Sequence, residues 1–281
     1  MKIAQINTVC GNGSVGRITV DIYHALKNAG HEGKIYYGRR TAPETAETEK
    51  FGSNLDMGIH VLSTFFTGTH GFNSKAQTEK LIESLKEYNP DLIHLHNIHG
   101  FYLDVENLFA YLKQCGKPVV WTLHDCWSFT GHCAYFDFAQ CERWRTGCYN
   151  CPQKHTYPAS MLRDGSKTNY RMKKELFTGI PNLTIVTPSQ WLANVVGESY
   201  LKAYPVEVRY NPINTQVFQP TASDFRQKYN LEGKTILLGV AGVWEERKGM
   251  RDFVKLHAML PENYHIVLVG VTPELEQNLP E

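Results

Sequence analysis

The stretch KIAQINTVCGNGSVG, residues 2–16, joins an apolar segment to a glycine-rich loop. Residues 2–9 are typical of a strand that is buried on both faces. After the loop, Ile18 and Ile22 begin an apolar pattern at helical spacing, which Gly30 ends. The stretch therefore predicts a strand, a loop and a helix, in that order, at the start of an α/β fold.

The same order of strand and helix repeats along the chain. Further strands are predicted over residues 34–37, 91–96, 118–123, 183–186 and 206–210. Residues 40–75 are polar and glycine-rich, and we expect them to be irregular. Repeated β-α-β units with buried strands predict a doubly wound parallel sheet.

A domain boundary is predicted within residues 211–220, so that residues 1–212 form one Rossmann-like domain and residues 213–281 a linker and part of a second. The second part shows a strand, a helix and a strand, over residues 235–240, 250–260 and 265–270. Two strands and one helix cannot close a Rossmann-like core. We therefore expect these 281 residues to be part of a longer protein.

The composition excludes several classes of protein. Lys and Arg number 29 against 28 Asp and Glu, a net charge of +1, so we expect no nucleic-acid partner. The 42% hydrophobic content is that of a globular protein. No apolar run approaches the roughly 20 residues of a membrane helix, and the N-terminal apolar stretch is too short for a signal peptide. We expect a soluble, cytoplasmic chain.

The glycine loop is a candidate ligand site. Gly11, Gly13 and Gly16 let a ligand approach the backbone, and the helix that follows directs its N–H groups at anions. A tight turn without a ligand is the alternative. The spacing matches a dinucleotide-binding fingerprint, but Arg39 and Arg40 stand where an NAD-binding domain needs an acid for the ribose, which disfavours an oxidoreductase.

Histidines follow two other strands, at the edge where parallel sheets bind ligands. We expect His94 to lie within its strand as a core residue, although His94 and His96 alternate as a metal pair would. His96 and His99 are placed to contact a sugar or a phosphate. His124 could bond a ligand, and Asp125 could act as a base or cap the following turn.

A cysteine-rich insertion covers residues 126–158. Four cysteines lie in it at spacings that suit a closed structural zinc site: Cys133, Cys141, Cys148 and Cys151. A disulfide or redox pairing and reduced core thiols stay open as alternatives. The chain has seven cysteines, an odd number, so at least one of them stays without a disulfide partner in the chain.

The second part of the chain carries one charged candidate. Arg247 and Lys248 follow a buried strand and precede a helix, where they could hold a phosphate by charge-assisted hydrogen bonds. A solvated charged surface is the alternative.

With these motifs taken together, the chain resembles the retaining GT-B glycosyltransferases of family 4, in the branch that makes bacterial polysaccharides such as colanic acid. The resemblance spans the whole chain. It is carried by residues 13–17, 29–32, 91–97, 122–133, 147–152, 189–193 and 211–220.

The resemblance implies two Rossmann-like domains with the active site between them. The first would bind a saccharide or lipid-linked saccharide acceptor, with His96, Asn97 and His99 in contact with it. His124 and Asp125 would be catalytic, with His124 touching the transferred sugar. The donor, a nucleotide-diphosphate sugar, would be held by a set drawn from both domains: Gly13, Ser14, Gly16, Arg247 and Lys248.

The resemblance further implies transfer with retention of configuration and without a catalytic metal, so a zinc ion would be structural. It also implies that the enzyme works at the cytoplasmic face of the inner membrane. In the family an arginine usually follows the strand glycine, where this chain has Val243, and Arg247 would take over its charge. The 281 residues end before the family's two donor-binding glutamates, so we expect weak or no activity from them alone. A non-catalytic module that binds nucleotides or carbohydrates is the alternative function.

Overall fold

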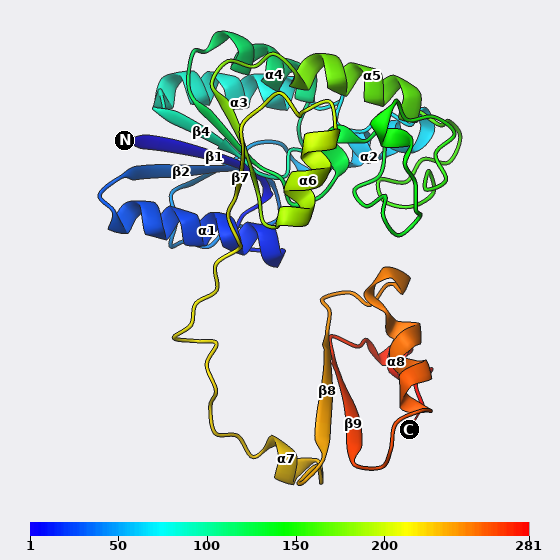
Figure 1. The fold of residues 1–281 in the computed structure, drawn as a ribbon. Helices are drawn as coiled ribbons and strands as arrows, with labels where there is room; N and C mark the ends of the chain where they lie inside the picture. The colour runs from blue at the N-terminus through cyan, green and yellow to red at the C-terminus, as the bar shows by residue number, and fades with distance from the viewer. Residues whose placement is uncertain (281) are drawn as a thin grey trace. The chain divides into compact units, whose positions relative to one another are not determined.

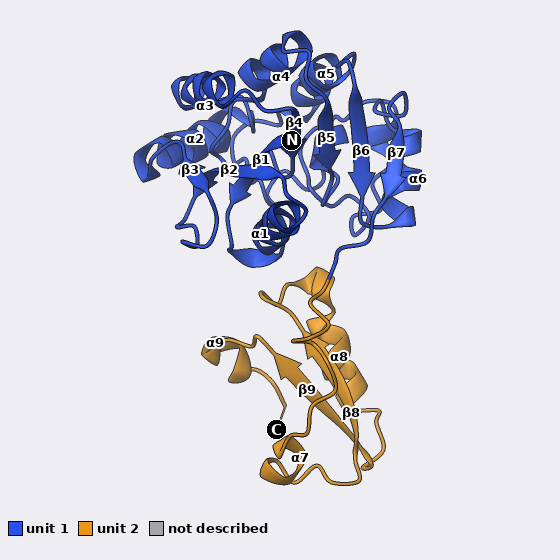
Figure 2. Cartoon of the chain, turned by 90° about the vertical axis from the view of Figure 1, so that its left-hand side faces the viewer, with its two compact units in different colours: residues 1–212 blue, residues 213–281 orange. Residues whose placement is uncertain are grey.

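The computed structural model describes residues 1–280 and divides them into two compact units (Figure 2). Unit 1 is Met1–Pro212, and unit 2 begins at Ile213. Each unit is a separate body with its own sheet.

Unit 1 is built on a parallel sheet with the strand order β3-β2-β1-β4-β5-β6-β7. The strands are β1 (Lys2–Val9), β2 (Glu32–Arg39), β3 (Thr48–Lys50), β4 (Leu92–Leu95), β5 (Val119–Thr122), β6 (Leu183–Thr187) and β7 (Val206–Val208). This confirms the predicted doubly wound α/β fold.

Helices cover both faces of this sheet (Figure 1). They are α1 (Gly13–Asn28), α2 (Asn54–Thr67), α3 (Lys75–Tyr88), α4 (Val105–Gln114), α5 (Ser166–Phe177) and α6 (Gln190–Glu198). Helices α3, α4 and α5 lie side by side over one face, and α1 lies on the other. Because both faces are covered, the central strands are mostly apolar instead of alternating, with a few polar exceptions such as Gln5, Asn7 and His94.

The strand order reverses between β1 and β4. After β1 the chain builds outward through β2 to β3, then crosses back to place β4 against the free side of β1. The loops that leave β1 and β4 therefore diverge, and the crevice between them is where open α/β sheets bind ligands.

An aromatic cluster connects the sheet to the helices above it. The ring of Phe109 from α4 lies 4.3 Å from that of Phe177 in α5, and Phe177 meets Trp121 of β5 edge to face at 5.2 Å. Trp121 also donates from Nε1 to the carbonyl of His96 at 3.2 Å. Core packing thus holds the backbone at the end of β4.

The expectation that residues 40–75 are irregular was wrong. They contain β3 and the four-turn helix α2. Ser53 and Asp56 form a capping box at the start of α2, and Gly68, at a φ of 73°, ends it. Leu55, Ile59, Leu62 and Phe66 repeat at helical spacing, but they lie on the exposed face, and the buried positions of α2 are the polar residues His60 and Thr64.

Unit 2 has the predicted strand, helix and strand. Strands β8 (Thr235–Val240) and β9 (Tyr264–Val269) pair in parallel, and α8 (Met250–His257) connects them. Unit 2 also contains two short helices, α7 (Phe225–Lys228) before β8 and α9 (Pro273–Glu276) after β9.

No helix within residues 1–280 is long and apolar enough to cross a bilayer.

Candidate functional site

In the glycine loop, Gly11 and Gly16 shape the backbone, whereas Gly13 is exposed to solvent. Gly11, at a φ of +71°, closes a turn by donating to the carbonyl of Gly16 at 2.8 Å. A Cβ on Gly16 would lie 3.1 Å from Val9, so this glycine permits close packing of α1 on β1. Gly13 and Ser14 are exposed, and nothing lies within 4 Å of a Cβ on Gly13. The first turn of α1 is therefore accessible and contains no acidic side chain.

A chain of hydrogen bonds runs from β1 to the end of β5. Gln5 Nε2 donates to the carbonyl of Thr19 at 3.1 Å, which turns Gln5 Oε1 toward His96 Nε2 at 3.3 Å. His96 Nδ1 lies 3.2 Å from His124 Nε2. Because Oε1 can only accept, His96 must donate from Nε2 and accept at Nδ1, so His124 donates from Nε2. The lone pair of His124 then lies on Nδ1, where a ligand hydroxyl can donate to it.

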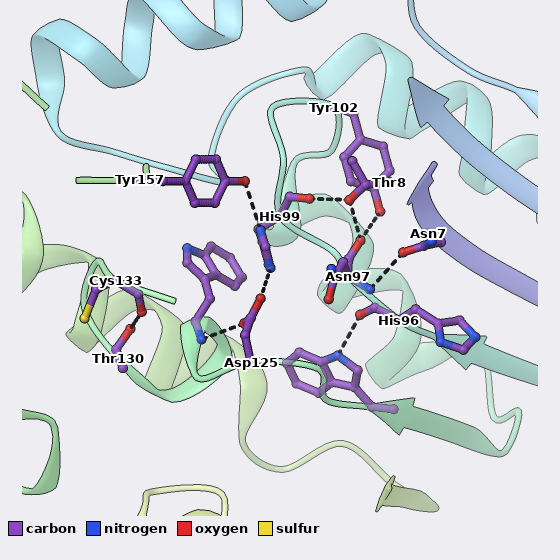
Figure 3. A network of polar contacts seen from close by, with 12 residues as sticks. Asn7, Thr8, His96, Asn97, His99, Tyr102, Asp125, Thr130, Cys133 and Tyr157 are labelled. Carbon is purple, nitrogen blue, oxygen red and sulfur yellow. Dashed lines mark hydrogen bonds and ion pairs between the residues drawn. The ribbon is translucent and has the colours of Figure 1, made fainter. Parts of the chain in front are cut away.

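A second network fixes Asp125 and His99 (Figure 3). Asp125 Oδ2 accepts from His99 Nε2 at 2.8 Å, and Asp125 Oδ1 accepts from the backbone N–H of Trp127 at 2.9 Å. His99 Nδ1 lies 3.2 Å from the hydroxyl of Tyr157. Burial by itself raises the pKa of Asp125, but His99, the N–H of Trp127 and His124 together outweigh burial and lower that pKa.

This arrangement bears on the role predicted for Asp125. Both carboxylate oxygens are engaged, one in the cap of the 3₁₀ turn Trp127–Phe129 and one with His99. The carboxylate therefore orients its neighbours through both of its oxygens. Its geometry favours a positioning residue over a base.

The backbone of Asn97 is held from three directions (Figure 3). Its N–H donates to Asn7 Oδ1 at 3.1 Å, and its carbonyl accepts from Thr8 Oγ1 at 3.0 Å and from the Tyr102 hydroxyl at 2.7 Å. Since all three partners bind the main chain, the Asn97 side chain is left for other contacts.

The predicted residues of β4 and β5 meet around one small cavity. It has a volume of about 10 Å³ and is lined by residues that include His96, Asn97, His99, His124 and Asp125. A space of that size holds at most about one water molecule. A ligand larger than a water molecule would therefore bind outside it, against the rim that these side chains support.

Sequence reasoning missed two residues of these networks. Gln5 orients His96, and its signal was available: Gln5 and Asn7 are polar residues, both 0% exposed, in a strand that is otherwise apolar. Tyr157 gave no such signal, because it lies in an irregular segment 58 residues from its partner His99. His94 bonds Thr122 Oγ1 at 2.8 Å, the satisfied arrangement expected for a core histidine.

The cysteine-rich insertion gathers the predicted thiols. One cavity of about 20 Å³ is lined by Cys133, Cys141, Cys148 and Cys151. All seven cysteines are free. Within residues 1–280, no group of three or more His, Cys, Asp or Glu side chains is arranged to hold a metal ion. The zinc site therefore stays a prediction.

The charged candidates of unit 2 lie in the 3₁₀ turn Glu246–Lys248, which precedes α8. Arg247 Nε is paired with Glu245 Oε2 at 2.8 Å, and Lys248 is exposed. Gly249, at a φ of 78°, turns the chain into α8. These residues belong to a different unit from the histidine networks.

Unit 1 buries many histidines in the neutral form. Burial lowers the pKa of His94 to about 4, and that of His124 also to about 4 although Asp125 partly opposes the shift. Burial likewise lowers the pKa of His60 and His132 to about 4, and it brings those of His70 and His96 well below their usual value.

Comparison with known families matches residues 13–217 to the family described as Glycosyltransferase Family 4. A protein of Escherichia coli K12, described as putative colanic acid biosynthesis glycosyl transferase WcaC, is 34% identical over 219 residues. The match covers 71% of this chain and 52% of that protein. The chain thus spans about half the length of this curated relative.

Solved glycosyltransferase structures share the fold. Sucrose-phosphate synthase from Thermosynechococcus elongatus superposes with a TM-score of 0.61 at 15% identity, over 97% of this chain and 63% of that one. Anabaena Alr3699/HepE, solved with UDP and glucose, gives 0.57 at 16% identity, over 95% and 60%. WaaG, a glycosyltransferase of lipopolysaccharide biosynthesis, gives 0.56 at 16% identity, over 95% and 62%.

The buried histidines predict that unit 1 loses stability as the pH falls from about 6.5 toward 4. In this range the unfolded chain protonates its histidines while the folded chain keeps those six neutral, so unfolding takes up protons. Each such histidine adds a slope of up to about 1.4 kcal/mol per pH unit to the free energy of unfolding. Urea unfolding at a series of pH values measures the slope. His94→Gln should lower it, and an unchanged slope in that variant would contradict the assignment.

Proposed function

Because the chain belongs to Glycosyltransferase Family 4, we propose that it acts in the transfer of a sugar during polysaccharide biosynthesis, with unit 1 on the acceptor side and unit 2 on the donor side. The observation that carries the proposal is the family match over residues 13–217, which spans every strand of unit 1 after β1 and the loops at their ends. The similarity to a colanic acid glycosyltransferase supports surface polysaccharide as the product. Neither finding favours a non-catalytic binding module.

The donor in this proposal is a nucleotide-diphosphate sugar. A structural neighbour was solved with UDP and glucose, which supports this class of donor without naming the base. The exposed first turn of α1, at Gly13 and Ser14, offers N–H groups and the positive end of a helix dipole to the diphosphate. Lys248, and Arg247 beside it, add positive charge from unit 2.

The proposed reaction retains the configuration of the sugar. The bond from the anomeric carbon to the diphosphate oxygen breaks, a bond to the acceptor oxygen forms on the same face, and the acceptor proton passes to the departing diphosphate. Negative charge grows on the diphosphate as it leaves, so fixed cations and N–H dipoles lower the barrier. This scheme uses no catalytic metal and no protein carboxylate as base, which agrees with the engaged state of Asp125.

His124 is assigned to the transferred sugar. Its Nδ1 lone pair is available, and its ring is held by His96 and, through it, by Gln5. His99 is held by Asp125 and Tyr157, and Asn97 by its backbone, so that both present fixed groups toward an acceptor. His96 acts through His124, because both of its ring nitrogens are bonded within the protein.

We also propose that the enzyme works at the cytoplasmic face of the membrane, on a lipid-linked acceptor. The support is a row of exposed apolar side chains along one side of α2: Leu55, Ile59, Leu62 and Phe66, between 50% and 73% exposed. Their spacing places them on one helical face, as in helices that lie in a membrane interface.

The donor proposal predicts saturable binding of one nucleotide class from a panel of UDP-, GDP-, ADP- and CMP-sugars, measured by calorimetry on the full chain. Lys248→Ala should weaken that binding roughly 10- to 100-fold, since a hydrogen bond to a charged group contributes about 1.5–3 kcal/mol. Lys255→Ala, which removes another exposed lysine of the same unit, is the matched control. Equal affinity in the Lys248 and Lys255 variants would remove Lys248 from the donor site.

The assignment of His124 predicts a separation of two affinities. His124→Ala should weaken binding of the nucleotide sugar about tenfold and leave the affinity for the free nucleoside diphosphate unchanged, because the imidazole contacts only the sugar. His94→Ala, which changes the neighbouring buried ring, is the control for general damage. A parallel loss of both affinities in His124→Ala would argue against a sugar contact.

The membrane proposal predicts that the chain sediments with vesicles of phosphatidylglycerol and phosphatidylethanolamine. Leu62→Asp should reduce the bound fraction severalfold, because it places a charge in the apolar row. Phe138→Asp changes an exposed aromatic residue outside α2 and should have no effect. Binding that survives Leu62→Asp would exclude this face.

A further inference from the structure

Residues 130–165 form a long segment with almost no regular structure. The single 3₁₀ turn Arg143–Arg145 is its only helix or strand, yet its first residues, 130–134, and Trp144 are buried. Loops of this length are uncommon in compact domains unless something organises them. The segment is therefore the part of unit 1 that most requires a cross-link or a bound ion.

The four thiols of this segment converge from distant positions. They line one cavity of about 20 Å³ together with His132 and Trp144, although Cys133 and Cys151 are 18 residues apart in sequence. Cys133 and Cys151 lie close enough for each to shift the pKa of the other. The four cysteines also lie near enough to one another for their charges to interact.

The backbone is shaped to meet one of these sulfurs. The N–H of Gly131 donates to Cys148 Sγ at 3.1 Å. A Cβ at position 131 would lie 2.6 Å from the Cβ of Cys148 and 2.1 Å from the carbonyl oxygen of Ser166, so only glycine permits this approach. Donors of this kind stabilise a sulfur that carries negative charge.

A buried cation faces the same cluster. Lys173 of α5 is 0% exposed, and its Nζ donates to the carbonyl of Trp127 at 2.6 Å and lies 3.9 Å from the centre of the Trp127 ring. Burial lowers the pKa of Lys173 to about 7, and Cys148, Cys133 and Asp125 oppose this shift, so nearby negative charge favours its ammonium form. Asp125 is already paired with His99. A buried ammonium requires an anion, and the thiols are the remaining source of one.

We propose that Cys133, Cys141, Cys148 and Cys151 bind a structural zinc ion as four thiolates, with Lys173 as the buried counter-charge. Binding of Zn²⁺ forms four Zn–S bonds and releases the four thiol protons to water, so the centre carries a charge of −2. The Lys173 ammonium offsets one of these charges, and the N–H of Gly131 stabilises one thiolate.

Zinc binding would draw the four thiols, which line one cavity, into a tetrahedron. A tetrahedral zinc with Zn–S bonds of about 2.3 Å sets its sulfurs about 3.8 Å apart. The four side chains surround the cavity without being directed at one point. A cysteine redirects its sulfur by rotation about a single bond, among staggered positions.

The zinc would also support the candidate site. The same segment carries Tyr157, whose hydroxyl bonds His99. A segment fixed by four metal bonds holds that hydroxyl in place, whereas a loose segment would release it. This consequence depends on the proposed function, but the metal site itself does not.

Elemental analysis of the full chain, purified under reducing conditions, tests the proposal. We expect about one zinc per chain, lost in Cys148→Ser and kept in Cys115→Ser, which changes a cysteine outside the cluster. If Cys148→Ser does not fold, the unmodified chain loaded with Co²⁺ gives the answer, because four thiolates produce intense sulfur-to-cobalt charge-transfer absorption. A folded, metal-free chain whose cobalt form lacks this absorption would overturn the proposal, as would a Cys133–Cys151 disulfide found by mass spectrometry.

Two further variants test the ligand set and the role of Lys173. His132→Gln should keep the zinc. If His132→Gln loses the zinc while Cys141→Ser keeps it, the four-thiolate set is refuted. Lys173→Met should release zinc to a chelator at least tenfold more readily, in the range seen for residues that support metal ligands. Lys174→Met alters the adjacent exposed lysine and should match the unmodified chain. Equal release from both lysine variants would remove Lys173 from the proposal.

Discussion

A parallel sheet covered on both faces can contain polar side chains only where each one finds a partner within the protein. This constraint governs the edge of unit 1 where β1, β4 and β5 end. Gln5 is buried in the central strand, and its amide is satisfied by Thr19 on one side and His96 on the other. Because His96 Nε2 donates to Gln5, His96 Nδ1 must accept, and it accepts from His124 Nε2. The protonation pattern of the rim is thus determined from inside the sheet.

The same requirement explains why the irregular segment after β5 belongs to the site. Asp125 is buried, so it needs the ring of His99, and His99 in turn takes the hydroxyl of Tyr157. Lys173 is buried beneath the segment and faces the thiols. Through these contacts the order of the cysteine cluster and the order of the rim depend on each other. A structural metal in the cluster would therefore act on the site without touching a substrate.

Unit 2 contributes a different kind of group. Its charged turn is exposed and lies ahead of α8, where Lys248 has water as its surroundings. An exposed ammonium group stays hydrated and charged, so it can bind a phosphate. The buried histidines of unit 1 stay neutral and suit hydroxyl groups.

The sequence by itself determined the α/β class, the strands of both units other than β3, and the gathering of His96, His99, His124 and Asp125 at one sheet edge, because strand periodicity and strand ends are local properties. It missed β3 and also α2, whose buried positions are the polar residues His60 and Thr64 and whose apolar residues face outward. Only the tertiary structure decided which nitrogen of His124 is available and that Asp125 is engaged. Those outcomes depend on partners such as Gln5 and Tyr157, which are distant in sequence and become neighbours only when the sheet and its covering segment close around them.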